Sequence, residues 1–198
     1  MTDKKLEIIK VTADLMHSNG YEATSVKDIM EAAQIGKGQF YYYFSSKEEL
    51  GLAVIDYCFE KWQKRVIEEN LAQPGDPQRK IRHMLACSID IHNKRESKCG
   101  CFFGNLAIEL SEKHEVFREK IYQMFSLWSH HLTLVIEEWR QEQALPLDCS
   151  SECLAQAIVA LLEGGILLMK SKQDIAPLRN AALVVEKMLA MEVRNFDE

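Results

Sequence analysis

Apolar residues recur at helical spacing along the chain, and no stretch alternates with the period of two that a β-strand shows. In residues 3–19, Ile9, Ala13 and Met16 fall three or four positions apart and predict one buried helix face. Gly20 follows as a typical signal for the C-terminal end of a helix. We therefore expect an all-α protein of about nine helices.

The stretch 24–50, TSVKDIMEAAQIGKGQFYYYFSSKEEL, predicts two short helices, a tight turn between them, and the capped start of a third. Thr24 is the expected N-cap of the first short helix and Gly36 that of the second. Phe40 and Phe44 share one face of the second helix and are its expected core anchors. Three consecutive tyrosines lie between them and cannot all be buried on one face, so this helix should present aromatic side chains outward.

Capping and turn signals divide the rest of the chain into six more helices. Ser46 with Glu49 predicts a capping box that starts a helix reaching about residue 72. Residues 73–77, QPGDP, form the clearest break in the chain. Further helices are expected over residues 77–93, 101–110, 116–143, 151–172 and 178–193. We expect two domains: a helix-turn-helix domain at 2–62, with its motif at 25–44, and a larger helical domain at 63–198.

The net charge of the whole chain and the charge of one segment favour different partners. The formal net charge of the 198-residue chain is −6, which taken alone argues against a nucleic-acid partner. Residues 34–47, however, contain two lysines and no acidic residue. Because salt screens each charge beyond roughly 10 Å, such a segment can still attract phosphates. These features favour a DNA-contacting surface on the second short helix.

Several classes of protein are disfavoured by missing motifs. The chain begins without an apolar signal-peptide run, and its longest apolar stretch, 154–169, falls short of the ~20 residues of a membrane span. We expect a cytoplasmic protein with reduced thiols and no membrane partner. No phosphate loop, GxSxG, HExxH or dinucleotide fingerprint occurs, so we expect neither an enzyme nor a cofactor. The cysteines and histidines lack zinc-site spacing, so no metal is expected.

Residues 6–52 resemble the DNA-binding domain of TetR-family repressors. The order glycine, any residue, Phe, three Tyr and Phe, followed by Ser-Lys-Glu, is far more specific than a generic helix-turn-helix. Two positions depart from the family pattern: Gln34 stands where Gly is usual, and Gly36 where Ser or Thr is usual. The matching residues are Gly20, Tyr21, Thr24, Ser25, Ile29, Ala33, Lys37, Gly38, Tyr41, Tyr42, Tyr43 and Phe44, with Ser46, Lys47, Glu48, Glu49 and Leu50.

The resemblance implies a double-stranded DNA operator as partner. By family position, Lys37, Gln39 and Tyr41 would meet base edges. Phosphates would be held by Thr24, Ser25, Tyr42 and Lys47, and Gly38 is a further expected DNA-binding residue. The alternatives from other classes are an all-α interaction protein that does not bind DNA and an all-α enzyme without a recognisable motif.

The resemblance also implies a homodimeric repressor that releases its operator when a small molecule enters the C-terminal domain. One short helix reads few bases, and two-fold pairing places two of them about 34–36 Å apart in successive major grooves. The alternative for the last two helices is a core within one chain. The expected interface residues are Leu154, Ile158, Leu161, Leu162, Gly165 and Leu168, with Ala181, Ala182, Val185, Met188 and Leu189.

A small-molecule pocket would draw on aromatic, sulfur-containing and a few polar side chains of the larger domain. Such side chains at helical spacing also form plain core, and we expect about a third of the set to line a pocket. The candidates are Trp62, Met84, Cys87, Cys101, Phe102, Asn105, Met124, Trp128 and His131.

Cys99 and Cys101 suggest a second way of sensing. Lys94, Arg95 and Lys98 precede them, and nearby cations lower the pKa of a thiol and make it reactive. A redox- or electrophile-sensing repressor is therefore an alternative to a ligand-binding one. The other interpretation of these cysteines is that they are small buried core residues.

Overall fold

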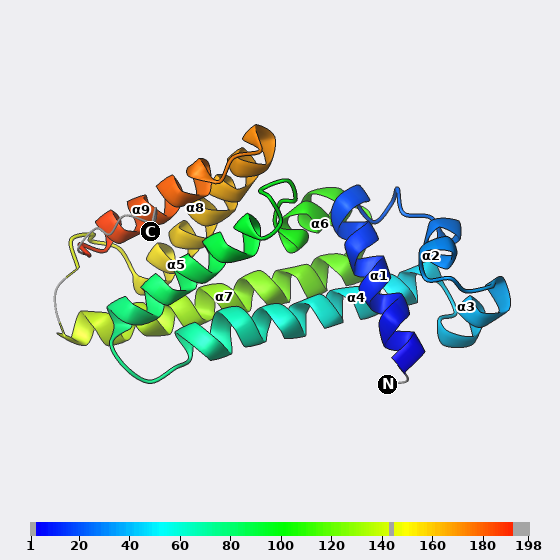
Figure 1. Ribbon diagram of the computed structural model, residues 1–198. Coiled ribbons are helices and arrows are strands. Elements are labelled where there is room, and N and C mark those ends of the chain that lie inside the picture. Colours follow the sequence, from blue (N-terminus) through cyan, green and yellow to red (C-terminus); the bar gives the residue numbers. More distant parts are fainter. Residues whose placement is uncertain (1–2, 143–144, 192–198) are drawn as a thin grey trace. The chain divides into compact units, whose positions relative to one another are not determined.

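Every regular element in the described residues, 3–142 and 145–191, of this computed structural model is helical (Figure 1). The all-α prediction is confirmed. Two of the predicted helix ends, at residues 143 and 193, lie outside the described residues. The elements are α1 (Asp3–Asn19), α2 (Val26–Ala32), α3 (Lys37–Tyr43), α4 (Lys47–Trp62), the π-helix η1 (Gln63–Leu71), α5 (Pro77–Asn93), α6 (Phe102–Leu110), α7 (Glu115–Glu142), α8 (Ser151–Lys172) and α9 (Ala176–Met188).

Contacts divide the chain into two units. Unit 1 comprises Met1–Lys61 with Phe102–Tyr122, and unit 2 comprises Trp62–Cys101 with Gln123–Glu198. Helix α6 and the first part of α7 therefore belong with the N-terminal helices. The predicted domains at 2–62 and 63–198 are continuous in sequence, whereas these units interleave, and that division stays a prediction.

The core of unit 1 forms around the buried faces that the periodicity predicts. Ile9 and Met16 of α1, Phe40 of α3 and Phe44, the C-cap of α3, are each at most 2% exposed. Gly51 of α4 allows a further close approach, because a Cβ added there would lie 2.7 Å from the Tyr21 ring and 3.0 Å from the Phe117 ring. Since α3 is only seven residues long, it depends on this packing rather than on its own helix propensity.

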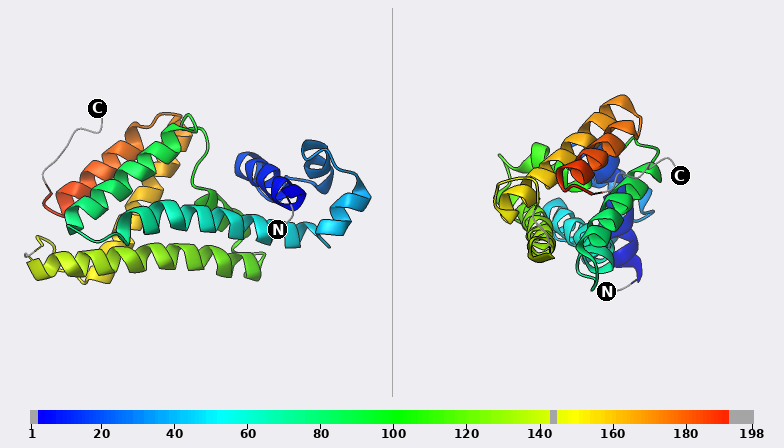
Figure 2. Two further views of the ribbon diagram at one scale, coloured as in Figure 1. Left: turned by 60° about the horizontal axis from the view of Figure 1, so that its bottom comes forward. Right: turned by 90° about the vertical axis from the view of Figure 1, so that its left-hand side faces the viewer.

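In unit 2, α8 and α9 run side by side (Figures 1 and 2). A Cβ added to Gly165 would lie 2.7 Å from the Cβ of Ala181, so this glycine permits the helices to approach closely. The prediction of Leu154, Ile158, Leu162, Gly165, Ala181, Ala182, Val185 and Leu189 as dimer-interface residues is wrong, because the chain's own packing buries them.

By length and composition alone, α8 is also apolar enough to cross a membrane, with a mean hydropathy of 1.7. A core helix passes the same test, and 44% of that window is buried inside the protein. The packing of one face of α8 against α9 therefore accounts for the apolar residues on that face.

Candidate nucleic-acid interface

Helix α2 begins at a capping box formed by Ser25 and Asp28. The Ser25 hydroxyl accepts a hydrogen bond from the Asp28 amide at 3.2 Å, and the Asp28 carboxylate accepts one from the Ser25 amide at 2.9 Å. The Ser25 hydroxyl also donates to the Asp28 carboxylate at 2.6 Å, and this bond together with that from the Ser25 amide lowers the pKa of Asp28. The prediction of Thr24 as the N-cap is wrong: Thr24 is buried, and its hydroxyl donates to the Gly20 carbonyl at 2.6 Å.

A Schellman motif links α2 to α3. The amide of Ile35 donates to the carbonyl of Met30 at 3.0 Å, and the amide of Gln34 donates to that of Glu31 at 3.2 Å. This motif needs a left-handed residue at Gln34, whose φ is 52° and where glycine would carry no Cβ penalty. Ile35 is buried beneath the turn, and Gly36 then serves as the N-cap of α3, as predicted.

The outer face of α3 carries the residues predicted to meet DNA. Lys37, Gly38 and Gln39 are exposed, and the Tyr42 side chain is 81% exposed. Tyr41 is also exposed and its ring lies edge-on to Phe40, with the ring centroids 5.2 Å apart. Tyr43 is half-buried, so the tyrosine triplet divides between the core side and the outer side, as its helical spacing requires.

Gly38 lies on this outer face beside Tyr42, four positions along. A Cβ added to Gly38 would meet no heavy atom within 4 Å. Glycine weakens a helix relative to alanine by roughly 0.5–1 kcal/mol, and the packing described for the chain gives no reason for it here. The arrangement suits close approach of another molecule to the backbone of α3.

Lys47 occupies the start of α4 and is half-buried. Its ammonium donates to the Glu22 carbonyl at 3.2 Å and lies 4.3 Å from the centroid of the Tyr21 ring. Burial raises the pKa of Tyr21 to about 12, with the charges of Glu48 and Glu22 adding to the effect. In this conformation Lys47 supports the α1–α2 loop, and its predicted phosphate contact stays a prediction.

One of the two hydrogen bonds of the predicted capping box at the start of α4 is confirmed. The Ser46 hydroxyl accepts a hydrogen bond from the Glu49 amide at 3.0 Å, as predicted. The Glu49 carboxylate, however, accepts hydrogen bonds from the amide and hydroxyl of Ser45, at 2.7 and 2.6 Å, rather than from Ser46. Both bonds lower the pKa of Glu49, which stays ionised at the N-terminus of α4.

The predicted pocket residues fall in both units. Phe102 and Asn105 belong to unit 1, and the other seven belong to unit 2. Trp62 and Trp128 pack edge to face, with ring centroids 5.7 Å apart, and burial lowers the pKa of His131. Of the set, Met84, Phe102, Met124 and Trp128 are buried, and Trp62, Cys87, Cys101, Asn105 and His131 are half-buried.

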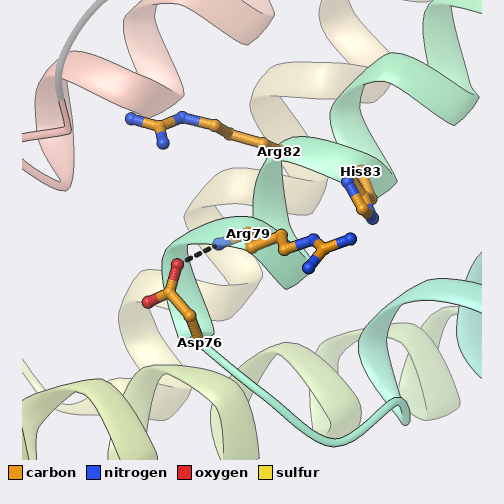
Figure 3. Close-up of a pocket in the computed structure, with 4 residues that line it drawn as sticks. All are labelled: Asp76, Arg79, Arg82 and His83. Atoms are coloured by element: carbon orange, nitrogen blue, oxygen red, sulfur yellow. Dashed lines mark hydrogen bonds between the residues drawn. The ribbon is translucent and has the colours of Figure 1, made fainter.

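A cavity of about 300 Å³ lies elsewhere in unit 2, beside the start of α5 (Figure 3). Its lining comprises Asp76, Arg79, Arg82 and His83. Asp76 caps α5 through the Gln78 and Arg79 amides, and Arg82 pairs with the fully buried Glu186 at 3.6 Å. Helix capping and a core ion pair therefore account for two of the four lining residues.

Glu163 of α8 is a half-buried acid that the sequence pattern did not single out as functional. The Cys101 thiol donates a hydrogen bond to its carboxyl group, and burial raises the pKa of Glu163 to about 7. Its Oε1 and the indole nitrogen of Trp128 are buried without a hydrogen-bond partner among the described residues. The signal for Glu163 in the sequence was its position as the single acid in a long apolar run.

Metal ligation finds no support in the part of the chain that the structure describes. Among those residues, no three His, Cys, Asp or Glu side chains form a group that could hold a metal ion. Cys99, the other predicted redox residue, is a half-buried free thiol.

Comparisons with known proteins match both parts of the chain. Residues 8–54 match the family model of bacterial regulatory proteins of the tetR family, and residues 77–185 match the tetracycline-repressor-like C-terminal domain. A helix-turn-helix-type transcriptional regulator in the lacX 3′ region of Lactococcus lactis subsp. lactis is 35% identical over 178 residues, 88% of this chain and 87% of that protein. The transcriptional repressor DhaR of Mycobacterium sp. (strain GP1) is 28% identical, with 98% and 96% covered.

Solved structures show the same fold. The regulatory protein TetR from Rhodobacter sphaeroides superposes with a TM-score of 0.85 at 23% identity, covering 94% of this chain and 99% of that one. The reduced form of E. coli NemR superposes with a TM-score of 0.82 at 24% identity, covering 96% and 98%.

Proposed function

The chain belongs to the TetR family of bacterial regulatory proteins, and on that premise we propose that it is a homodimeric repressor that a small molecule releases from its operator. It is a DNA-binding transcriptional regulator and not an enzyme. The observation that carries the proposal is the outer face of α3, where Lys37, Gly38, Gln39 and two exposed tyrosines lie together without an acidic residue.

The proposed contacts follow from this geometry. Lys37, Gln39 and Tyr41 read base edges in the major groove, while Ser25 and Tyr42 hold phosphates on either side. The Tyr42 side chain is 81% exposed. Burial of its large aromatic ring against the DNA backbone would contribute favourably to the free energy of binding. Thr24 is left out, because its hydroxyl is engaged within the protein.

Dimerisation is supported by the outward face of α8 and α9. Leu167 and Leu168 of α8 and Val184 of α9 are exposed, and Gly164 presents open backbone beside them. Small residues at Ala157 and Ala160 continue the same face toward the start of α8. A two-fold interface here, in place of the buried residues named from sequence, would pair two copies of the same surface.

Effector binding is supported by two buried polar atoms of unit 2. Glu163 Oε1 and Trp128 Nε1 have no hydrogen-bond partner among the described residues. A buried polar atom without a partner costs about 1–3 kcal/mol, which a bound molecule with a complementary donor and acceptor would recover. We therefore propose that the effector binds within unit 2. We also propose that the protein is cytoplasmic.

A thiol-based switch is the second candidate, favoured by the hydrogen bond between Cys101 and Glu163. A carboxyl group with a pKa near 7 can accept the thiol proton as the sulfur adds to an electrophilic alkene, and return it to the adjacent carbon. Treating the native protein with a maleimide and mapping adducts by mass spectrometry tests this. The candidate fails if Cys101 and Cys99 stay unmodified or if modification leaves DNA binding intact.

Fluorescence anisotropy on DNA from upstream of the protein's own gene tests the primary proposal. Tyr42→Ala should weaken binding, whereas Tyr122→Ala, which removes a 68% exposed tyrosine of α7, should not. Affinity should also fall steeply with salt, because phosphate contacts release counterions. Equal retention of both variants, with no salt dependence, would refute the repressor assignment.

A further inference from the structure

A carboxylate on α6 holds the loop between α1 and α2. Glu109 Oε2 accepts a hydrogen bond from the Tyr21 amide at 3.0 Å, and Oε1 accepts one from the Glu22 amide at 2.8 Å. All three residues belong to unit 1, although 87 and 88 positions of sequence separate the partners. Two amides bound by one carboxylate make a strong, directional contact, because the acceptor is ionised.

The residue before these amides is shaped to admit the carboxylate. Gly20 has a φ of 87°, in the left-handed region, and a Cβ added there would lie 2.9 Å from both oxygens of Glu109. A side chain at this position would push the carboxylate away from the loop. The backbone of residues 20–22 and the Glu109 side chain are therefore fitted to each other.

Other contacts converge on the same loop. The Glu22 carbonyl accepts the hydrogen bond from Lys47, and the Glu22 carboxylate lies 3.0 Å from His114 Nε2. The Tyr21 ring packs against Phe117, with ring centroids 4.8 Å apart. The loop is thus held by α4, by α6 and by the segment that opens α7.

The position of this loop sets the start of α2. The Thr24 hydroxyl donates to the Gly20 carbonyl at 2.6 Å, and Ser25 directly after it is the N-cap of α2. The Schellman turn at Gln34 then connects α2 to α3 without a flexible linker. A shift of residues 20–22 would therefore displace Ser25 at the start of α2 and alter the contact that holds the Lys47 ammonium.

We propose that Glu109 is a positioning residue for DNA binding: its carboxylate fixes the α1–α2 loop, and through it Ser25 and Lys47, in the arrangement that fits the operator. This rests on the proposed function as a DNA-binding repressor. Glu109 lies near the end of α6, about 10 Å along the helix from Phe102. Operator affinity is then set by a contact outside the recognition helix.

Glu109→Gln tests the proposal, with Glu112→Gln as a matched control that removes an exposed carboxylate one turn further on. A glutamine offers one acceptor oxygen where two amides point, so one of the two contacts is lost. We expect the Tyr21 and Glu22 amides to exchange hydrogen roughly tenfold or more faster in Glu109→Gln, because a charge-assisted bond is replaced. Exchange in α8 and α9 should be unchanged in both variants.

Operator affinity is the second readout, measured at a temperature where circular dichroism shows each variant folded. Glu109→Gln should weaken binding roughly tenfold or more, since both protomers of a dimer lose the contact, while Glu112→Gln binds as wild type does. Gly20→Ala displaces the same carboxylate from the other side and should have the same two effects. It serves in place of Glu109→Gln if that variant does not fold.

The outcomes separate two failures. Faster exchange at Tyr21 and Glu22 with unchanged operator affinity would show that Glu109 stabilises the loop without serving DNA binding, and it overturns the proposal. Unchanged exchange overturns it as well. If the wild-type protein binds no operator, the proposed function itself fails, and the exchange data then describe the loop alone.

Discussion

Replacing Gly38 with alanine should strengthen the fold and weaken DNA binding. The added Cβ would meet no heavy atom of the protein within 4 Å, so it creates no clash. Alanine stabilises a helix by roughly 0.5–1 kcal/mol relative to glycine. For a chain of this size, 1 kcal/mol shifts Tm by roughly 2–4 °C, so the melting temperature should rise by about 1–4 °C.

The same methyl group should obstruct the operator. It lies on the outer face of α3, beside the exposed Tyr42, where the backbone would approach DNA closely. Forcing a methyl group into a packed interface costs about 1–3 kcal/mol. A dimer meets this cost in both half-sites, so the total is at least about 2 kcal/mol, or roughly a thirtyfold loss of affinity.

Thermal melts and fluorescence anisotropy on one preparation measure both effects. Ala86→Gly, at an exposed position of α5, is the control: it should lower Tm by a similar amount without changing operator affinity. If Gly38→Ala raises Tm yet binds the operator within threefold of wild type, DNA does not approach the backbone at Gly38 and the proposed docking is incorrect.

Three further changes test individual parts of the structure. Gln34→Gly should raise the free energy of unfolding by about 1 kcal/mol, seen in urea titrations, because glycine adopts φ near 52° without strain; no gain would contradict the strained turn. Gly165→Ala should lower that free energy by about 1–3 kcal/mol, since its Cβ would lie 2.7 Å from that of Ala181; an unchanged free energy would contradict the packing of α8 on α9. The raised pKa of Glu163, about 7 against an ordinary 4.5, means that the folded protein keeps a proton that the unfolded chain releases, so its stabilising contribution is complete below about pH 4.5 and is lost as pH rises through about 7. Urea midpoints should therefore fall between pH 5 and pH 8 in wild type and fall less in Glu163→Gln; the same slope in both would contradict the assignment.

The sequence predicted helix boundaries well where a local signal decides them. Gly20 has the left-handed φ of 87° that ends α1, and Ser150 accepts the capping hydrogen bond that starts α8. The prediction of Thr24 rather than Ser25 as the N-cap of α2 was wrong, because both residue types can cap a helix. The hydrogen bond from the Thr24 hydroxyl to the Gly20 carbonyl decides between them. Local chemistry gave two valid answers there, and tertiary structure selected one.

Contacts between distant residues could not be predicted in the same way. Helix α8 is apolar on more than one face, so sequence periodicity could not show that Ile158 packs inward while Leu168 stays exposed. Neither the hydrogen bonds from the α1–α2 loop to Glu109 nor that from Cys101 to Glu163 has a local sequence signature. These contacts depend on how helices far apart in the chain come together.

A hydroxyl-radical footprint on the DNA upstream of the protein's own gene tests the central claim most directly. A dimer with two α3 helices should protect two segments related by two-fold symmetry, with centres about 34–36 Å apart or a multiple of that spacing. Tyr42→Ala should abolish the protection at a concentration where Tyr122→Ala retains it. Absence of protection, or a footprint that both variants keep, would contradict the account.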